Sequence, residues 1–292
     1  MNTEVDKRIT KIRGGESVRG DIQVFLAGGK LSPEAKEQFV AALRQAPEPQ
    51  RERLVKALLA IGRMADPAYQ PGGMLLRDPG VIEVLATEGL SKPSTARDAT
   101  IEALLNYVPV ELLTPHGAAI LGSLKASPDA DSFLLVAKAK PAGARGVVVD
   151  YAADASWGKE EAVHIAMAAF GDTAEEQKII KRFVDAPNPE EKGKRARALA
   201  EVGTTTSLRA LASEMRTDAI YEMKMTMERS IRVDIVAALS FAFPDKPFLW
   251  DNAVHDDAGY ARIEEFCEKT FGIKWTKPRP PFLWIQGFPA SR

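Results

Sequence analysis

Histidine and cysteine side chains most often bind metals or act as nucleophiles, and this chain of 292 residues has few of them. His116, His164 and His255 are far apart, and none stands at a metal-binding spacing from another or from Cys267. Two aspartates follow His255, but no second group of ligands accompanies them. We therefore expect no metal site.

The sequence also lacks the motifs of nucleophilic and nucleotide-dependent enzymes. No G-x-S-x-G is present. Cys267 shares a helical face with Ile263 and Phe271, which is typical of a small buried residue, and a single cysteine forms no intrachain disulfide. The segment FLAGGKLS (25–32) lacks the first glycine of a phosphate-binding loop, and Leu31 follows its lysine. We expect a flexible turn there, no catalytic residue and no cofactor.

Basic residues between positions 192 and 232 are the strongest candidates for binding. Arg195, Arg197, Arg229 and Arg232 could form a stripe that binds anions. Glutamates interleave with them, however, and favour a solvated face of mixed charge; they are Glu190, Glu191, Glu201, Glu214 and Glu228. The net charge of −1 gives no support for a protein that neutralises many phosphates.

The spacing of apolar residues predicts that helices position these side chains. Residues 1–30 are polar and contain two Gly-Gly pairs, so we expect an irregular N-terminal arm. Three consecutive valines at 147–149 are compatible with a strand, but a lone strand would leave its backbone unpaired, so we expect a helix over 145–153. The other expected helices are 33–46, 50–62, 81–88, 94–107, 110–124, 129–140, 159–170, 174–185, 190–203, 208–217 and 227–243.

One pattern of residues occurs twice, about 37 residues apart. Arg-x-x-Ala-x-x-x-Val-Gly at 195–203 matches Arg-x-x-Ile-Val-x-Ala-Leu-Ser at 232–240, and Leu199 and Leu239 fall on the inner faces of these helices. Both segments resemble the second helix of a HEAT repeat, as do 54–62, 97–105 and 163–171 more loosely. The aspartate that usually precedes the arginine is absent at both positions, so a ladder of Asp–Arg pairs is not implied.

The resemblance implies an all-α fold, a right-handed α-solenoid of about six HEAT-like helix pairs over residues 31–243. In that family the second helices line a concave side. Residues 244–292 are rich in aromatic residues and proline, and we expect a capping helix and a partly extended tail. The tail either seals the last repeat, with Trp275 and Trp284 at least half-buried, or docks a partner through residues such as Trp284.

Two functions follow from this architecture. The first is a non-catalytic scaffold that binds a protein or peptide along the concave face, a function suggested by analogy of fold. The alternative is a nucleic-acid-binding protein or DNA glycosylase-like enzyme, because some DNA glycosylases are built on HEAT-like repeats. The sequence has no apolar stretch of membrane-spanning length and no secretory signal at its start. We expect a cytoplasmic protein; an exported chain with its signal removed is the alternative.

Overall fold

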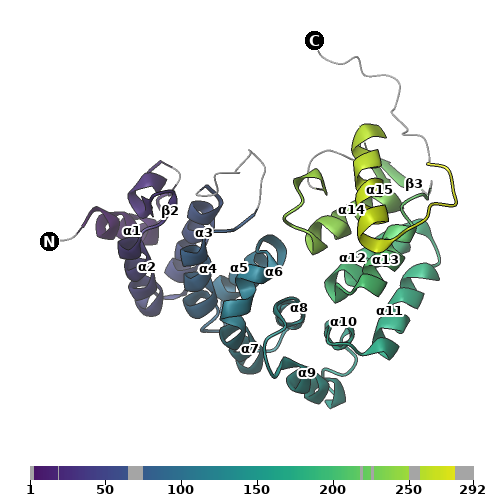
Figure 1. The fold of residues 1–292 in the computed structure, drawn as a ribbon. Helices are drawn as coiled ribbons and strands as arrows, with labels where there is room; N and C mark the ends of the chain where they lie inside the picture. The colour runs from purple at the N-terminus through teal and green to yellow at the C-terminus, as the bar shows by residue number, and fades with distance from the viewer. Residues whose placement is uncertain are drawn as a thin grey trace, which may run out of the picture. The chain divides into compact units, whose positions relative to one another are not determined.

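The computed structural model describes residues 3–18, 20–64, 75–217, 220–224, 227–249 and 257–279, and most of them are helical (Figure 1). The predicted all-α class is therefore confirmed. The chain divides into two compact units, Met1–Phe170 (unit 1) and Gly171–Arg292 (unit 2). This boundary falls within the predicted repeat region of residues 31–243. None of the helices in the described part has an apolar stretch long enough to cross a bilayer.

The expectation of an irregular arm over residues 1–30 is wrong for its first half, because α1 (Glu4–Gly14) is a regular helix. The Thr3 side chain accepts a hydrogen bond from the backbone of the first turn, and Gly15 ends the helix in the left-handed conformation. Val5, Ile9 and Ile12 are buried at helical spacing. Charged residues lie between these three, so the segment is polar in composition and its short apolar face was not predicted.

The glycine pair at 28–29 forms the turn of a hairpin. Gly28 and Gly29 have φ values of +59° and +76°, which suit a two-residue turn between antiparallel strands. The strands are β1 (Leu26–Ala27) and β2 (Lys30–Leu31), and the 3-10 helix η1 (Ile22–Phe25) precedes them. The Leu31 backbone N–H donates to Asp78 Oδ2 over 2.9 Å, which ties the hairpin to the start of α4.

The remaining helices of unit 1 begin and end close to the predicted positions. Valines 147–149 lie in a helix, as predicted. Two boundaries differ, because the helix expected over 110–124 is interrupted by a 3-10 turn, and Gly62 lies inside α3 against Leu76 instead of ending that helix. The helices are α2 (Pro33–Gln45), α3 (Glu48–Met64), α4 (Pro79–Val84), the π-helical turn η2 (Leu85–Gly89), α5 (Thr95–Tyr107), α6 (Val110–Leu113), η3 (Thr114–His116), α7 (Gly117–Ala126), α8 (Ala130–Ala139), α9 (Ala144–Ala153) and α10 (Glu161–Ala169).

Alternate helices pack on one another in unit 1. Helix α3 contacts α1 and α5, and α8 contacts α5 and α10. The helices between them cover one side of this layer, as α2 packs on α1 and α3, α7 on α8, and α9 on α10. Leu54, Leu58, Leu104 and Val136 are fully buried where the layers meet. The helices of this layer therefore pack both on one another and on the helices that cover them.

Unit 2 contains the two helices that carry the repeated pattern. They are α12 (Pro189–Val202) and α14 (Ile231–Ala242), and they pack side by side (Figure 1). The helix predicted over 227–243 begins only at Ile231, because Ser230 caps it and the preceding residues pair as a strand. The other elements are α11 (Thr173–Val184), α13 (Thr205–Ser213), the antiparallel strands β3 (Ile220–Lys224) and β4 (Met227–Ser230), the 3-10 helix η4 (Pro247–Leu249) and α15 (Asp257–Phe271).

Residues 272–279 fold back against α13 and α15. Glu264 is 2% exposed and accepts hydrogen bonds from Arg216 and Arg279. Arg216 also donates to the Lys277 carbonyl over 2.6 Å, and its guanidinium lies 4.8 Å from the centre of the Trp275 ring. The expected burial of Trp275 is confirmed, since this side chain is half-buried. Trp284 lies outside the described residues.

Leu199→Ala and Leu239→Ala each remove a fully buried side chain from α12 or α14. We expect each change to lower the free energy of unfolding by about 2–5 kcal/mol, measured by denaturant titration, because a cavity replaces packed methyl groups. Val184→Ala is the control: its side chain is 47% exposed, so we expect a change within about 0.5 kcal/mol. Losses no larger than the control at both leucines would contradict the assigned packing of these helices.

Candidate functional site

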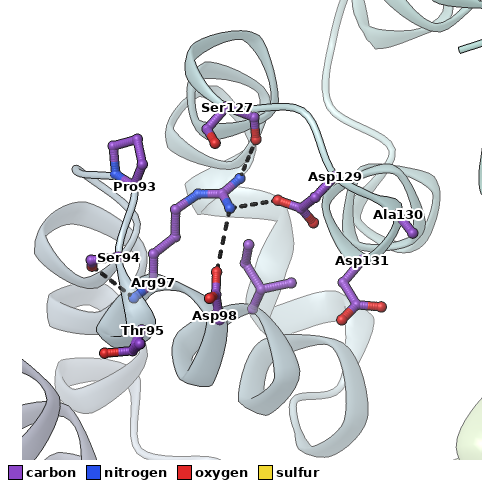
Figure 2. A pocket seen from close by; sticks show the side chains of 10 residues that line it. Pro93, Ser94, Thr95, Arg97, Asp98, Ser127, Asp129, Ala130 and Asp131 are labelled. Carbon is purple, nitrogen blue, oxygen red and sulfur yellow. Dashed lines mark hydrogen bonds and ion pairs between the residues drawn. The ribbon is translucent and has the colours of Figure 1, made fainter. Parts of the chain in front are cut away.

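A cavity of about 710 Å³ opens at the first turns of α5 and α8 (Figure 2). Both helices start here because a polar side chain caps each of them. Ser94 Oγ accepts from the Arg97 backbone N–H over 3.2 Å, and Asp129 Oδ1 accepts from the Ser132 N–H over 2.9 Å. The cavity is lined by Pro93, Ser94, Thr95, Arg97, Asp98, Ile101, Ser127, Asp129, Ala130 and Asp131.

Arg97 is 2% exposed and reaches from α5 to α7 and α8. Its Nε donates to Ser123 Oγ over 2.9 Å, and its Nη1 donates to Asp129 Oδ2 over 2.5 Å. Nη2 donates to the Ser127 carbonyl over 2.7 Å and to Ser132 Oγ over 2.6 Å. Each guanidinium nitrogen thus has an acceptor within the protein. Arg97 is a structural cation that joins three helices, and it has no spare nitrogen for a ligand.

The pKa of Asp129 reflects this pairing. Burial alone would raise the pKa of this carboxyl group, but hydrogen bonds from Arg97 and Ser132 outweigh burial and hold the pKa below its usual value. Asp129 therefore stays ionised around neutral pH and forms a stable ion pair with Arg97.

Two further carboxylates of the cavity remain accessible to a ligand. The Asp98 side chain is 71% exposed and lies 3.8 Å from Arg97, and Asp131 is exposed and turned away from Arg97 in Figure 2. Pro93 and Ile101 add apolar surface. Such a cavity can accept hydrogen bonds from ammonium, guanidinium or amide groups. No group of three histidine, cysteine or carboxylate side chains suited to a metal ion occurs among the residues that the structure describes.

Sequence reasoning singled out Arg97 as a position of the repeated pattern and missed its partners. Asp129 and Ser132 are more than thirty residues away in the chain, and no local spacing connects them to Arg97. The available signal was the capping motif of the two helices, Ser-x-x-Arg at 94–97 and Asp-x-x-Ser at 129–132.

Arg195 lies at a second cavity, of about 380 Å³, between α11 and α12. Its Nη1 donates to the Arg182 carbonyl near the end of α11 over 2.7 Å. The other residues lining this cavity are Lys178, Lys181, Arg182 and Asp185. Basic side chains at a helix C-terminus offset the negative end of the helix dipole, which accounts for much of this cluster.

The other predicted binding residues have different surroundings. Arg197 donates to Glu201 Oε1 over 2.8 Å, and its guanidinium stacks on Phe241 with 3.4 Å from Cζ to the ring centre. Arg232 is 3% exposed, and its Cζ lies 5.5 Å from the centre of the Tyr260 ring. The structure therefore places Arg195 at a cavity, Arg197 in a half-buried ion pair and Arg232 in the core. The Arg229 side chain and Trp284 lie outside the described residues.

The candidate nucleophile and bases are also engaged in structure. Cys267 is fully buried, and burial together with Glu264 and Glu268 raises the pKa of its thiol to about 12, so it stays protonated near neutral pH. His164 Nε2 lies 3.1 Å from the Gly158 carbonyl. His116 is the last residue of η3 and directly precedes α7, and burial lowers its pKa. His255 lies outside the described residues.

No protein-family model, no curated protein and no solved structure matches this chain.

Arg97→Ala should lower the free energy of unfolding by about 3–5 kcal/mol, because it leaves buried hydroxyl and carbonyl oxygens without a donor. Arg195→Ala is the matched control: its side chain is 35% exposed and makes one backbone hydrogen bond and a long ion pair with Glu191 (3.8 Å), so we expect a loss of about 1 kcal/mol or less. Both values come from denaturant titrations. Equal losses in the two variants would show that Arg97 does not hold the helices together.

The Asp129 pairing predicts a dependence of stability on pH. Because the folded pKa lies below the unfolded value, the stabilisation is complete above the ordinary pKa of about 3.9 and is lost as the pH falls through the folded pKa. The difference in unfolding free energy between the wild type and Asp129→Asn should therefore be largest at neutral pH and shrink below about pH 4. A difference that does not change with pH would rule out this ion pair as its source.

Proposed function

We propose that this chain is a non-catalytic scaffold of stacked HEAT-like helix pairs that binds a protein or peptide partner. The observation that carries the proposal is the packing of alternate helices, in which α3 lies between α1 and α5, and α8 between α5 and α10. Such stacks leave one face of the alternate helices open along their length, and solenoid proteins bind partners on faces of this kind. In unit 1 that face belongs to α1, α3, α5, α8 and α10.

The chemistry of the α5–α8 cavity supports recognition more than catalysis. Arg97 and Asp129 are paired with each other and with neighbouring polar groups, so they maintain the shape of the cavity. Asp98 and Asp131 remain at its mouth, where a lysine, arginine or amide group of a partner could approach. Exposed side chains of this kind set the orientation and rate of association between proteins.

A nucleic-acid-binding function is the second candidate, because four cations surround the α11–α12 cavity. If DNA binds there, labelled DNA should bind the whole chain with an affinity that falls steeply as salt is added. The affinity should fall further in Lys181→Glu. We expect weak binding that Lys181→Glu does not change, since Asp185 and the carbonyl end of α11 oppose an anion at this place.

The scaffold proposal is tested with the whole chain as bait in a cross-linking pull-down from its native lysate. A partner should be captured by the wild type and reduced about tenfold by the double change Asp98→Lys and Asp131→Lys, because charge reversal opposes a complementary surface. The control pair Glu111→Lys and Asp150→Lys places the same charges on exposed positions of α6 and α9, outside the α5–α8 cavity. We expect this pair to capture the partner as the wild type does.

Two outcomes would contradict the proposal. In one, the acidic-to-lysine change at 98 and 131 and the control change at 111 and 150 reduce the amount of every captured protein equally, or neither change reduces it. In the other, turnover of a substrate is abolished by a single substitution in the α5–α8 cavity, which would indicate an enzyme.

A further inference from the structure

A groove of about 440 Å³ lies between the C-terminal end of α1 and one side of α3. Its floor is apolar: Ile12, Val18 and Ala57 are at most 6% exposed, and Leu59 and Ala60 are half-buried. Gly15 and Ser17, in the turn that follows α1, also line it. The volume falls in the range of sites that hold a few side chains or a small ligand.

Three cations of α3 line the same groove. Arg53, Lys56 and Arg63 are three and seven residues apart, so they lie along one side of the helix. Glu16 is the acidic residue of the lining, and it is paired with Arg8 over 3.3 Å. The groove therefore combines an apolar floor with a row of positive charge.

Arg53 and Lys56 keep donors that are available to a partner, whereas Arg63 is partly covered. Arg53 donates one hydrogen bond, from Nη1 to the Arg13 carbonyl over 2.7 Å. Lys56 makes an ion pair with Glu52 over 2.6 Å in which its own side chain is 65% exposed, and such surface pairs are weak. The Arg63 guanidinium lies 4.7 Å from the centre of the Tyr107 ring, and its Nε is buried with no acceptor among the described residues.

Local contacts account for part of this row. Cations are favoured in the last turn of a helix, which explains Arg63. Arg53 donates to a carbonyl in the last turn of α1, and Lys56 pairs with Glu52 one turn earlier in α3. Both side chains are nevertheless exposed beside the groove, where a partner can reach them.

We propose that this groove binds an acidic peptide segment of a partner protein. An apolar side chain of the segment packs on Leu59 and Ala60, while flanking carboxylates pair with Arg53 and Lys56. Arginine favours carboxylates because its fork of donors matches two oxygens. The apolar floor favours a peptide over a nucleic acid, because unspecific nucleic-acid binding depends on phosphate contacts. The inference rests on the proposed scaffold function and assigns it a surface and a partner chemistry.

The test measures binding of fluorescent peptides to the whole chain by anisotropy. The probe alternates leucine and glutamate, and two comparison peptides carry glutamine or lysine in place of glutamate. We expect the glutamate peptide to bind at least about tenfold more tightly than either comparison peptide, and more weakly as salt is added.

Two variants locate the binding. The double change Arg53→Glu and Lys56→Glu should weaken binding of the glutamate peptide by about tenfold or more. Ala60→Trp fills the groove without altering charge and should weaken it similarly. The control pair Lys92→Glu and Lys125→Glu makes the same change at exposed positions outside the groove and should leave binding unchanged. Thermal unfolding followed by circular dichroism verifies that each variant is folded.

Three results would overturn the inference: equal binding of the three peptides, binding lost equally in the control pair, or binding that Ala60→Trp leaves intact. Single-stranded DNA could displace the glutamate peptide completely and bind Ala60→Trp as well as the wild type. That result would indicate a phosphate-binding surface instead. The peptide assay could fail while the double change Asp98→Lys and Asp131→Lys still reduces partner capture. That result would overturn the proposed role of this groove and leave the scaffold function standing.

Discussion

The buried guanidinium of Arg97 is the contact on which the centre of unit 1 depends. A buried charge is stable only when paired and hydrogen-bonded, and Arg97 meets this condition with oxygens from α7 and α8 and from the loop between them. Arg51 is likewise 2% exposed and donates to the Leu43 carbonyl over 2.6 Å and to the Glu88 carbonyl over 2.5 Å, while its Nε has no acceptor among the described residues. Lys138 likewise donates to the Leu105 carbonyl over 2.6 Å. Basic side chains thus satisfy the carbonyls that helices leave unpaired at their ends.

For the proposed scaffold function, this arrangement determines which charges remain for a partner. Buried cations that bind helix ends are committed to the fold, and such a cation, Arg97, lines the α5–α8 cavity. Charges that remain on the open sides of α3, α5 and α8 are of both signs: Arg53 and Lys56 are basic, whereas Asp98 and Asp131 are acidic. A partner that matched both surfaces would present acidic and basic groups in the complementary order. Specificity of this kind comes from the pattern of charge, which explains how a chain with a net charge of −1 could still select a partner.

Local patterns predicted most helices, and contacts between distant residues account for what was missed. Helices such as α5 and α8 were predictable because the apolar face and the capping residue of each lie within about a dozen consecutive residues. The α1 helix was missed because Val5, Ile9 and Ile12 are separated by charges, and β4 was read as helix because Met227–Ser230 continues into the periodicity of α14. For the candidate site, Arg97 was identified, but its partners in α7 and α8 depend on packing and could not be read from spacing. The acidic and basic surfaces likewise arise from helices that the sequence does not place side by side.

The central claim is that a partner binds on the open face of the alternate helices in unit 1. Hydrogen exchange of the whole chain, measured with and without the partner captured in the pull-down, tests it most directly, because backbone amides under an interface exchange more slowly. The account predicts slower exchange in the first turns of α5 and α8 and along α3, with α6 and α9 unchanged. Protection confined to α6, α7 and α9, or protection restricted to unit 2, would contradict it.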